Sequence, residues 1–154
     1  MARVCCRKIP GLPAVHCFVQ VKNGGSYSDG RQCLQCPPVQ EARYGLQGPP
    51  PFGSSEHSEA GRIHINDPFD APNKSDCGSW NEECDTNSCV VNIVNSYSNP
   101  SMYNAIFGPN SNTFAGTIAR ACNLKEPDTS WLAPGWYNSP APPYQHVPHG
   151  WGDK

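Results

Sequence analysis

The chain has 154 residues, a length typical of one domain with a buried core. Only 37% of the residues are hydrophobic, whereas 17 prolines and 14 glycines favour long loops, so the core should be thin. The formal net charge is −2 and no cluster of Lys and Arg exceeds the pair Arg7-Lys8, which argues against nucleic acid as a partner. No run approaches the roughly 20 apolar residues that cross a bilayer, so no membrane span is expected.

The first predicted element is a strand over residues 15–21, VHCFVQV. Four alternating residues form its inward face: Val15, Cys17, Val19 and Val21. His16 then lies on the opposite face. Residues 22–60 are mostly Gly, Ser, Pro and Gln without periodicity, which predicts a long loop tied down by Cys33 and Cys36. A second, shorter strand is expected over residues 61–67, GRIHIND, with His64 facing away from its two isoleucines.

Two helices are predicted in the second half of the chain. The first covers about residues 80–97, because Ser79 and Glu82 have capping-box spacing and apolar residues follow at helical spacing. The second covers about residues 111–122, after the turn sequence Gly-Pro-Asn that ends at Asn110. Its N-cap is expected to be Ser111 or Asn110, whose side-chain oxygen would accept a backbone N–H of the first turn.

Nine cysteines indicate cross-links in a loop-rich chain. They are Cys5, Cys6, Cys17, Cys33, Cys36, Cys77, Cys84, Cys89 and Cys122. Eight could form four disulfides and leave one thiol, although the sequence does not choose the pairing. Cys33-x-x-Cys36 also has the spacing of half a zinc site or of a redox pair, so these alternatives stay open. The N-terminus lacks the apolar block of a secretory signal, so no export route is visible although cross-links favour an extracytoplasmic location, secreted or at the cell surface.

Three polar side chains could form a hydrolytic site. Nucleophilic catalysis needs a nucleophile, a base and a group that orients the base. Ser111 stands at a helix start, where free N–H groups favour developing negative charge, and His16 and His64 stand on strand faces away from apolar neighbours. The alternative is that Ser111 or its neighbour only caps the helix.

The motifs VHCFVQV and PNSNTFAGTIAR resemble the circularly permuted papain-like group of NlpC/P60 relatives. The resemblance implies His16 as base and Ser111 at the position of the nucleophilic cysteine, with Asn110 and Asn112 lining the site, and His64 is a candidate orienting group. It covers about 20 of 154 residues, and the serine departs from the family, which implies an inactive relative or a serine-dependent variant. The chain is also similar to C-terminal segments of bacterial exported proteins and polymorphic toxins.

The end of the chain is rich in aromatic residues and proline. Trp131, Trp136, Tyr137, Tyr144 and Trp151 alternate with prolines, which suits polyproline recognition or glycan stacking, or else packing of one or two rings into the core. We expect a cysteine-rich domain over residues 1–125 and a tail over residues 126–154 that packs on it or is disordered.

The sequence as a whole predicts a small single α+β domain of short antiparallel strands, two helices and long Pro/Gly loops held by disulfides. The leading hypothesis is a papain-like hydrolase or acyltransferase relative that acts outside the cytoplasm on a peptide, peptidoglycan or acyl substrate without a cofactor. The alternative is a non-enzymatic disulfide-stapled structural or binding module with a protein partner. Whether the chain is an enzyme stays open.

Overall fold

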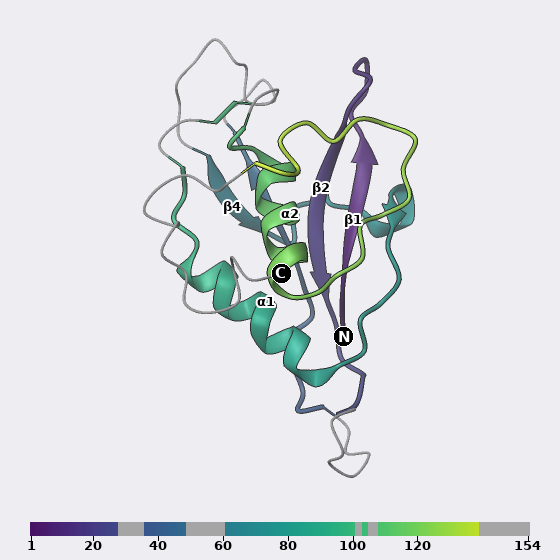
Figure 1. The fold of residues 1–154 in the computed structure, drawn as a ribbon, viewed down its shortest axis with the longest axis vertical. Coiled ribbons are helices and arrows are strands. Elements are labelled where there is room, and N and C mark those ends of the chain that lie inside the picture. Colours follow the sequence, from purple (N-terminus) through teal and green to yellow (C-terminus); the bar gives the residue numbers. More distant parts are fainter. Residues whose placement is uncertain (28–35, 49–60, 101–102, 105–107, 139–154) are drawn as a thin grey trace.

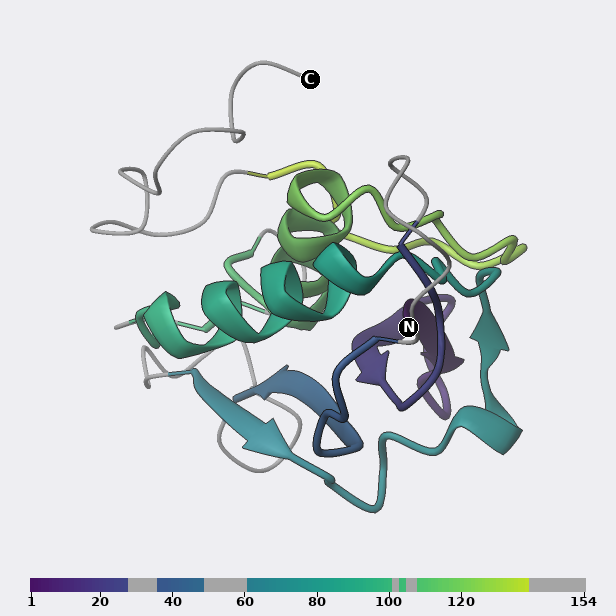
Figure 2. The same cartoon turned by 90° about the horizontal axis from the view of Figure 1, so that it is seen from below.

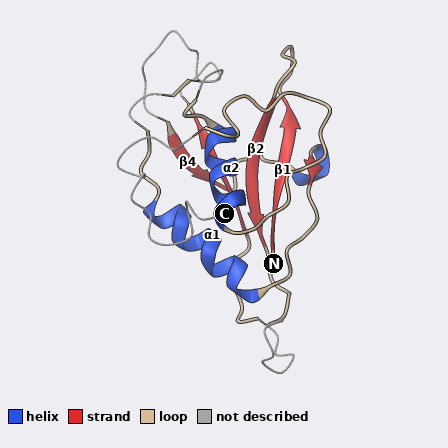
Figure 3. Cartoon of the chain, viewed as in Figure 1, coloured by secondary structure: helices blue, strands red, loops and turns tan. Residues whose placement is uncertain are grey.

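The computed structural model describes residues 1–27, 36–48, 61–100, 103–104 and 108–138, which form one antiparallel sheet and two α-helices (Figure 1). The strands are β1 (Ala2–Lys8), β2 (Val15–Val21), β3 (Ala42–Gln47), β4 (Arg62–Ile65) and β5 (Asp76–Cys77), in the order β4-β3-β2-β1-β5. The helices are α1 (Cys84–Ser96) and α2 (Ser111–Ala121), and a 3-10 turn, η1 (Pro72–Lys74), precedes β5. The α+β class with antiparallel strands and two helices is confirmed (Figure 3).

Both helices cover the same face of the sheet, and we call this the helix face. Figure 2 shows α1 and α2 on one side of the strands and the connection from β4 to β5 on the other. The predicted inward face of β2 points to the helices, because its four alternating residues belong to the same buried cluster as Phe114 and Ile118 of α2. Strand alternation therefore puts His16 and Phe18 on the opposite face, which we call the loop face.

The connection between β4 and β5 crosses the loop face from one edge of the sheet to the other, since these two strands are the outermost ones. Asp70 lies within this connection and is fully buried. Its carboxylate Oδ1 is 2.7 Å from Nε2 of His16, and its carbonyl accepts a hydrogen bond from Arg43 at 2.9 Å. Gly45 of β3 leaves room for the carboxylate, because a Cβ there would collide with it. One buried residue thus fixes the crossing segment, through its carboxylate to β2 and through its carbonyl to β3.

Four disulfides hold the elements together, as the sequence predicted. Cys5–Cys77 joins β1 to β5 and Cys6–Cys17 joins β1 to β2. Cys36–Cys84 attaches the segment before β3 to the first residue of α1, and Cys89–Cys122 links the two helices. The zinc alternative for Cys36 is excluded, since its sulfur is bonded to Cys84 and a sulfur in a disulfide is not a thiolate ligand. Cys33 lies outside the described residues.

The sequence missed three strands. β1 and β5 were not predicted, and β3 lies inside residues 22–60, which were expected to form a loop. The segment Ala42–Gln47 does alternate, with Leu46 buried and Gly45 on the other face, but its proline-rich surroundings hid this pattern.

The first helix starts later than expected and the second as expected. Asn81 pairs with Ala2 beside β1, which keeps residues 80–83 extended. The N-cap of α1 is Glu83, whose side chain makes no capping bond, so the capping box of Ser79 and Glu82 does not form. The predicted helix over residues 111–122 is confirmed as α2, Ser111–Ala121.

We predict that Gly45→Ala destabilises the fold, because its methyl group would push the buried carboxylate of Asp70 away from His16. The expected loss is about 1–3 kcal/mol in free energy of unfolding, measured by urea denaturation. Gln47→Ala, on the same strand and face, is the matched control and should change stability by less than about 0.5 kcal/mol. Equal effects of the two substitutions would contradict the role assigned to Asp70.

Candidate functional site

The start of α2 uses the side chain of Asn110 as its N-cap. The Asn110 carbonyl oxygen Oδ1 accepts hydrogen bonds from the backbone N–H groups of Asn112 and Thr113, both at 3.0 Å. Its backbone oxygen accepts the N–H of Phe114 at 3.0 Å. Of the two N-cap candidates, Asn110 is correct and Ser111 is not. The N–H groups of Asn112 and Thr113, which could otherwise bind an oxyanion at this helix start, are thus already engaged by Asn110.

Ser111 lies in the interior of the protein. It is 4% exposed, and its Oγ is 3.5 Å from the side-chain oxygen of Asn112. The other neighbour of the hydroxyl is Tyr103: burial raises the pKa of the Tyr103 phenol, while hydrogen bonds from the side chain and backbone of Ser111 oppose this shift. The hydroxyl is thus committed to internal partners.

The side chain of Asn112 supplies hydrogen-bond partners along the part of the β2 edge where no strand pairs. β3 pairs with β2 only at residues 19–21, so the earlier part of that edge needs other partners. The amide of Asn112 supplies them, since its Oδ1 accepts from the N–H of Cys17 at 3.0 Å and its Nδ2 donates to the carbonyl of Val15 at 2.9 Å. Asn112 is 2% exposed, so these bonds form away from water, where leaving a backbone group unpaired is costly.

His16 does not meet Ser111. Asn112 binds the backbone of β2 on the helix side, on either side of His16, while the imidazole points to the loop face and contacts Asp70. His64 also lies on the loop face, opposite Gly45 on β3, and its Nδ1 is 3.5 Å from Asp67. The structure therefore groups the two histidines on one face and places Ser111, with its two neighbouring asparagines, on the other.

The pair of His16 and Asp70 is the arrangement in the described residues that most resembles catalytic machinery. A buried carboxylate orients an imidazole whose side chain is 13% exposed, as in a base with its orienting group. Within the described residues, the ring of His16 has no hydrogen bond to a hydroxyl or thiol that could act as nucleophile. Sequence reasoning missed Asp70, because an aspartate in the aperiodic segment DPFDAP gives no signal of its partner.

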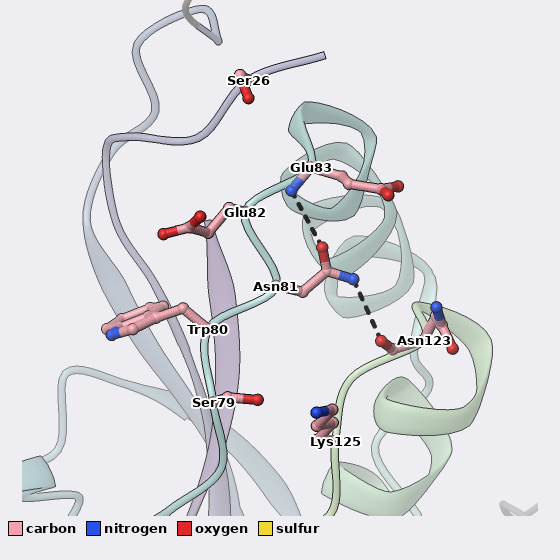
Figure 4. Close-up of a pocket in the computed structure, with 8 residues that line it drawn as sticks. All are labelled: Ser26, Ser79, Trp80, Asn81, Glu82, Glu83, Asn123 and Lys125. Carbon is pink, nitrogen blue, oxygen red and sulfur yellow. Dashed lines mark hydrogen bonds between the residues drawn. The ribbon is translucent and has the colours of Figure 1, made fainter. Parts of the chain in front are cut away.

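A pocket of about 420 Å³ opens beside the start of α1 (Figure 4). Its lining is polar and consists of Ser26, Ser79, Trp80, Asn81, Glu82, Glu83, Asn123 and Lys125. Asn81 is already occupied, because it accepts from the N–H of Glu83 at 3.0 Å and donates to the carbonyl of Asn123 at 3.2 Å. The ring of Trp80 is also engaged, with the cations of Arg3 and Lys22 4.2 and 4.3 Å from ring centroids. Two of the lining side chains, Asn81 and Trp80, therefore already bind other groups of the protein.

Residues 126–138 of the expected tail pack on the domain through α2. The carbonyl of Pro134 accepts hydrogen bonds from the side chains of both Asn110 and Asn112, each at 3.1 Å. Trp136 is buried in the core, whereas Trp131 is 38% and Tyr137 is 77% exposed. Tyr144 and Trp151 lie outside the described residues. We call residues 131–138 the aromatic segment. Its Trp136 ring belongs to the core, and its Trp131 and Tyr137 rings are exposed.

No protein-family model matches the chain, and comparison with curated proteins and with solved structures gives no significant match. The resemblance to papain-like NlpC/P60 relatives thus rests on its two short motifs. Within the described residues, no group of three or more His, Cys, Asp or Glu side chains could hold a metal ion.

We predict that Asn112→Ala is among the most destabilising single substitutions in α2. It would leave the N–H of Cys17 and the carbonyl of Val15 buried without a partner, at a cost of about 2–4 kcal/mol in free energy of unfolding. Asn95→Ala, an exposed asparagine of α1, is the control and should change stability by about 0.5 kcal/mol or less. Chemical denaturation of both variants measures the difference, and a mild effect of Asn112→Ala would refute the edge-completing role.

Proposed function

We propose that the chain is a non-enzymatic binding module, stabilised by disulfides, that acts outside the cytoplasm. The observation that carries this proposal is the state of the start of α2. Ser111 is buried, and the first-turn N–H groups of Asn112 and Thr113 are bonded to Asn110, so nucleophile and oxyanion donors are both committed to the fold. The aromatic segment, residues 131–138, then supplies the contact surface through its exposed rings, Trp131 and Tyr137.

The cross-links support the proposed location. Disulfides persist in oxidising compartments and are rare in reducing ones, and four of them are formed here. Among the described residues, no helix is long and apolar enough to cross a membrane.

The PNSNTF motif has a structural explanation that needs no catalysis. Asn110 caps α2, Asn112 completes the edge of β2, and Phe114 is fully buried against Tyr97, with ring centroids 4.9 Å apart. Each residue that supports the resemblance to a papain-like site is used in packing or hydrogen bonding.

A hydrolase of papain-like ancestry is the second candidate, and the contact between His16 and Asp70 is the observation that favours it. Under this hypothesis the imidazole would act as a base oriented by Asp70. It requires a nucleophile that reaches the loop face, and Ser111 is on the helix face, so this candidate ranks below the binding module.

We predict that the purified, oxidised protein hydrolyses peptide, ester and peptidoglycan substrates no faster than its Ser111→Ala variant. Ser111→Cys should add no activity either, because a thiol at this position would be buried and without a base. Ser88→Ala, an exposed serine of α1, is the control for assay variation. The binding-module proposal fails if the wild type turns over a substrate and both Ser111→Ala and His16→Ala abolish turnover while remaining folded.

A further inference from the structure

Exposed apolar side chains gather at one end of the molecule, where the β1–β2 turn meets the aromatic segment. We call this surface the tip and define it by Lys8, Leu12, Trp131 and Leu132. Leu12 is 50% exposed, Leu132 is 69% exposed and Trp131 is 38% exposed. Single exposed leucines are ordinary on a protein surface, but three large apolar residues from two distant segments at one place mark an interaction site.

The two segments of the tip are fixed to each other. The N–H of Val15 donates to the carbonyl of Leu132 at 3.0 Å, so the aromatic segment lies alongside the end of the β1–β2 turn. The ammonium of Lys8 is 3.9 Å from the centroid of a Trp131 ring. The tip is therefore preorganised, and presenting it to a partner costs little further ordering.

The turn that carries Leu12 projects from the sheet. Figure 1 shows the connection between β1 and β2 projecting beyond the ends of both strands. Small ligands bind in concave sites, so a projecting turn with leucines suits insertion into a soft surface better than capture of a small molecule.

The one charged residue among the four that define the tip is Lys8. Its ammonium lies over Trp131, while the preceding residue, Arg7, points to the opposite face of β1 and lies 5.2 Å from the ring centroid of Phe69. Phe69 is 55% exposed. Residues 8–15 contain no aspartate or glutamate, whereas Asp128 and Glu126 precede Trp131 and are exposed. Apolar residues at the end, aromatic rings behind them and cations beside the rings match the layers of a lipid interface, from acyl chains to anionic headgroups.

We propose that the tip is a membrane-docking surface that inserts Leu12 and Leu132 into the headgroup region of an anionic lipid bilayer, with Lys8 bound to lipid phosphates. The inference rests on the proposed binding function and names the partner of its exposed aromatic segment. A protein partner would be expected to use a flatter site with buried aromatic or arginine anchors, whereas leucine is under-represented among such anchors.

The test is sedimentation of the oxidised full chain with vesicles of phosphatidylcholine containing phosphatidylserine, and with vesicles of phosphatidylcholine alone. We expect binding to the anionic vesicles that weakens as salt is raised, together with a blue shift of tryptophan emission that Trp131→Phe diminishes. The double substitution of Leu12→Ser and Leu132→Ser should lower the partition coefficient about tenfold or more, because two partly inserted leucines are removed. Lys8→Glu should lower it on anionic vesicles only.

Ile65→Ser is the matched control, since Ile65 is 61% exposed on the edge strand β4 and outside the tip. Leu12→Ser alone serves as a second variant, because Leu12 lies in an exposed turn, and near-UV circular dichroism verifies that each variant is folded. Absence of binding to anionic vesicles, or equal losses for Ile65→Ser and the tip variants, would overturn the proposal. So would self-association by analytical ultracentrifugation that the leucine substitutions remove without vesicle binding, because a second copy would then cover the tip. Hydrolytic turnover would instead refute the non-enzymatic function and leave the vesicle result standing.

Discussion

The rest of this structure depends on the hydrogen bonds between the side chain of Asn112 and the backbone of β2. This side chain closes the gap along β2 where β3 no longer pairs, and its Nδ2 also donates to the carbonyl of Pro134. One buried amide thus joins the central strand, the second helix and the segment that ends at Asn138. Without it, the polar backbone at Val15 and Cys17 would face the core unpaired, and the segment carrying Trp131 would lose an anchor.

The same contact explains why the expected catalytic pair does not assemble. Asn112 binds the backbone of the residues on either side of His16, and the side chains of those residues point to the helices. In a strand the residue between them must point the other way, so anchoring α2 at this register turns His16 to the loop face. On the loop face, His16 contacts the carboxylate of Asp70, and this contact fixes the connection between β4 and β5 to the sheet.

Periodic elements could be predicted from the sequence, and contacts between distant residues could not. β2 was predicted with its bounds and inward face because Val15–Val21 alternates cleanly, and α2 because apolar residues recur at helical spacing after a turn. β3 was missed because its proline-rich surroundings hid the alternation, and because Gly45, which leaves room for Asp70, is a residue type that disfavours strands. The choice between Asn110 and Ser111 as N-cap, and the partner of His16, depended on how the chain folds back over the sheet, which no local pattern specifies.

One disulfide, Cys5–Cys77, compensates for the uneven coverage of the sheet. On the helix face, α1 and α2 bury the apolar side chains of the central strands, whereas on the loop face a crossing segment without an α-helix covers β2 and β3. A single segment buries little apolar surface, so it adds less hydrophobic stabilisation than a helix. Cys5–Cys77 fastens the end of this segment to β1, and Asp70 fixes its middle. This disulfide therefore acts on the face with the thinner cover, whereas Cys6–Cys17 and Cys89–Cys122 belong to the core on the helix face.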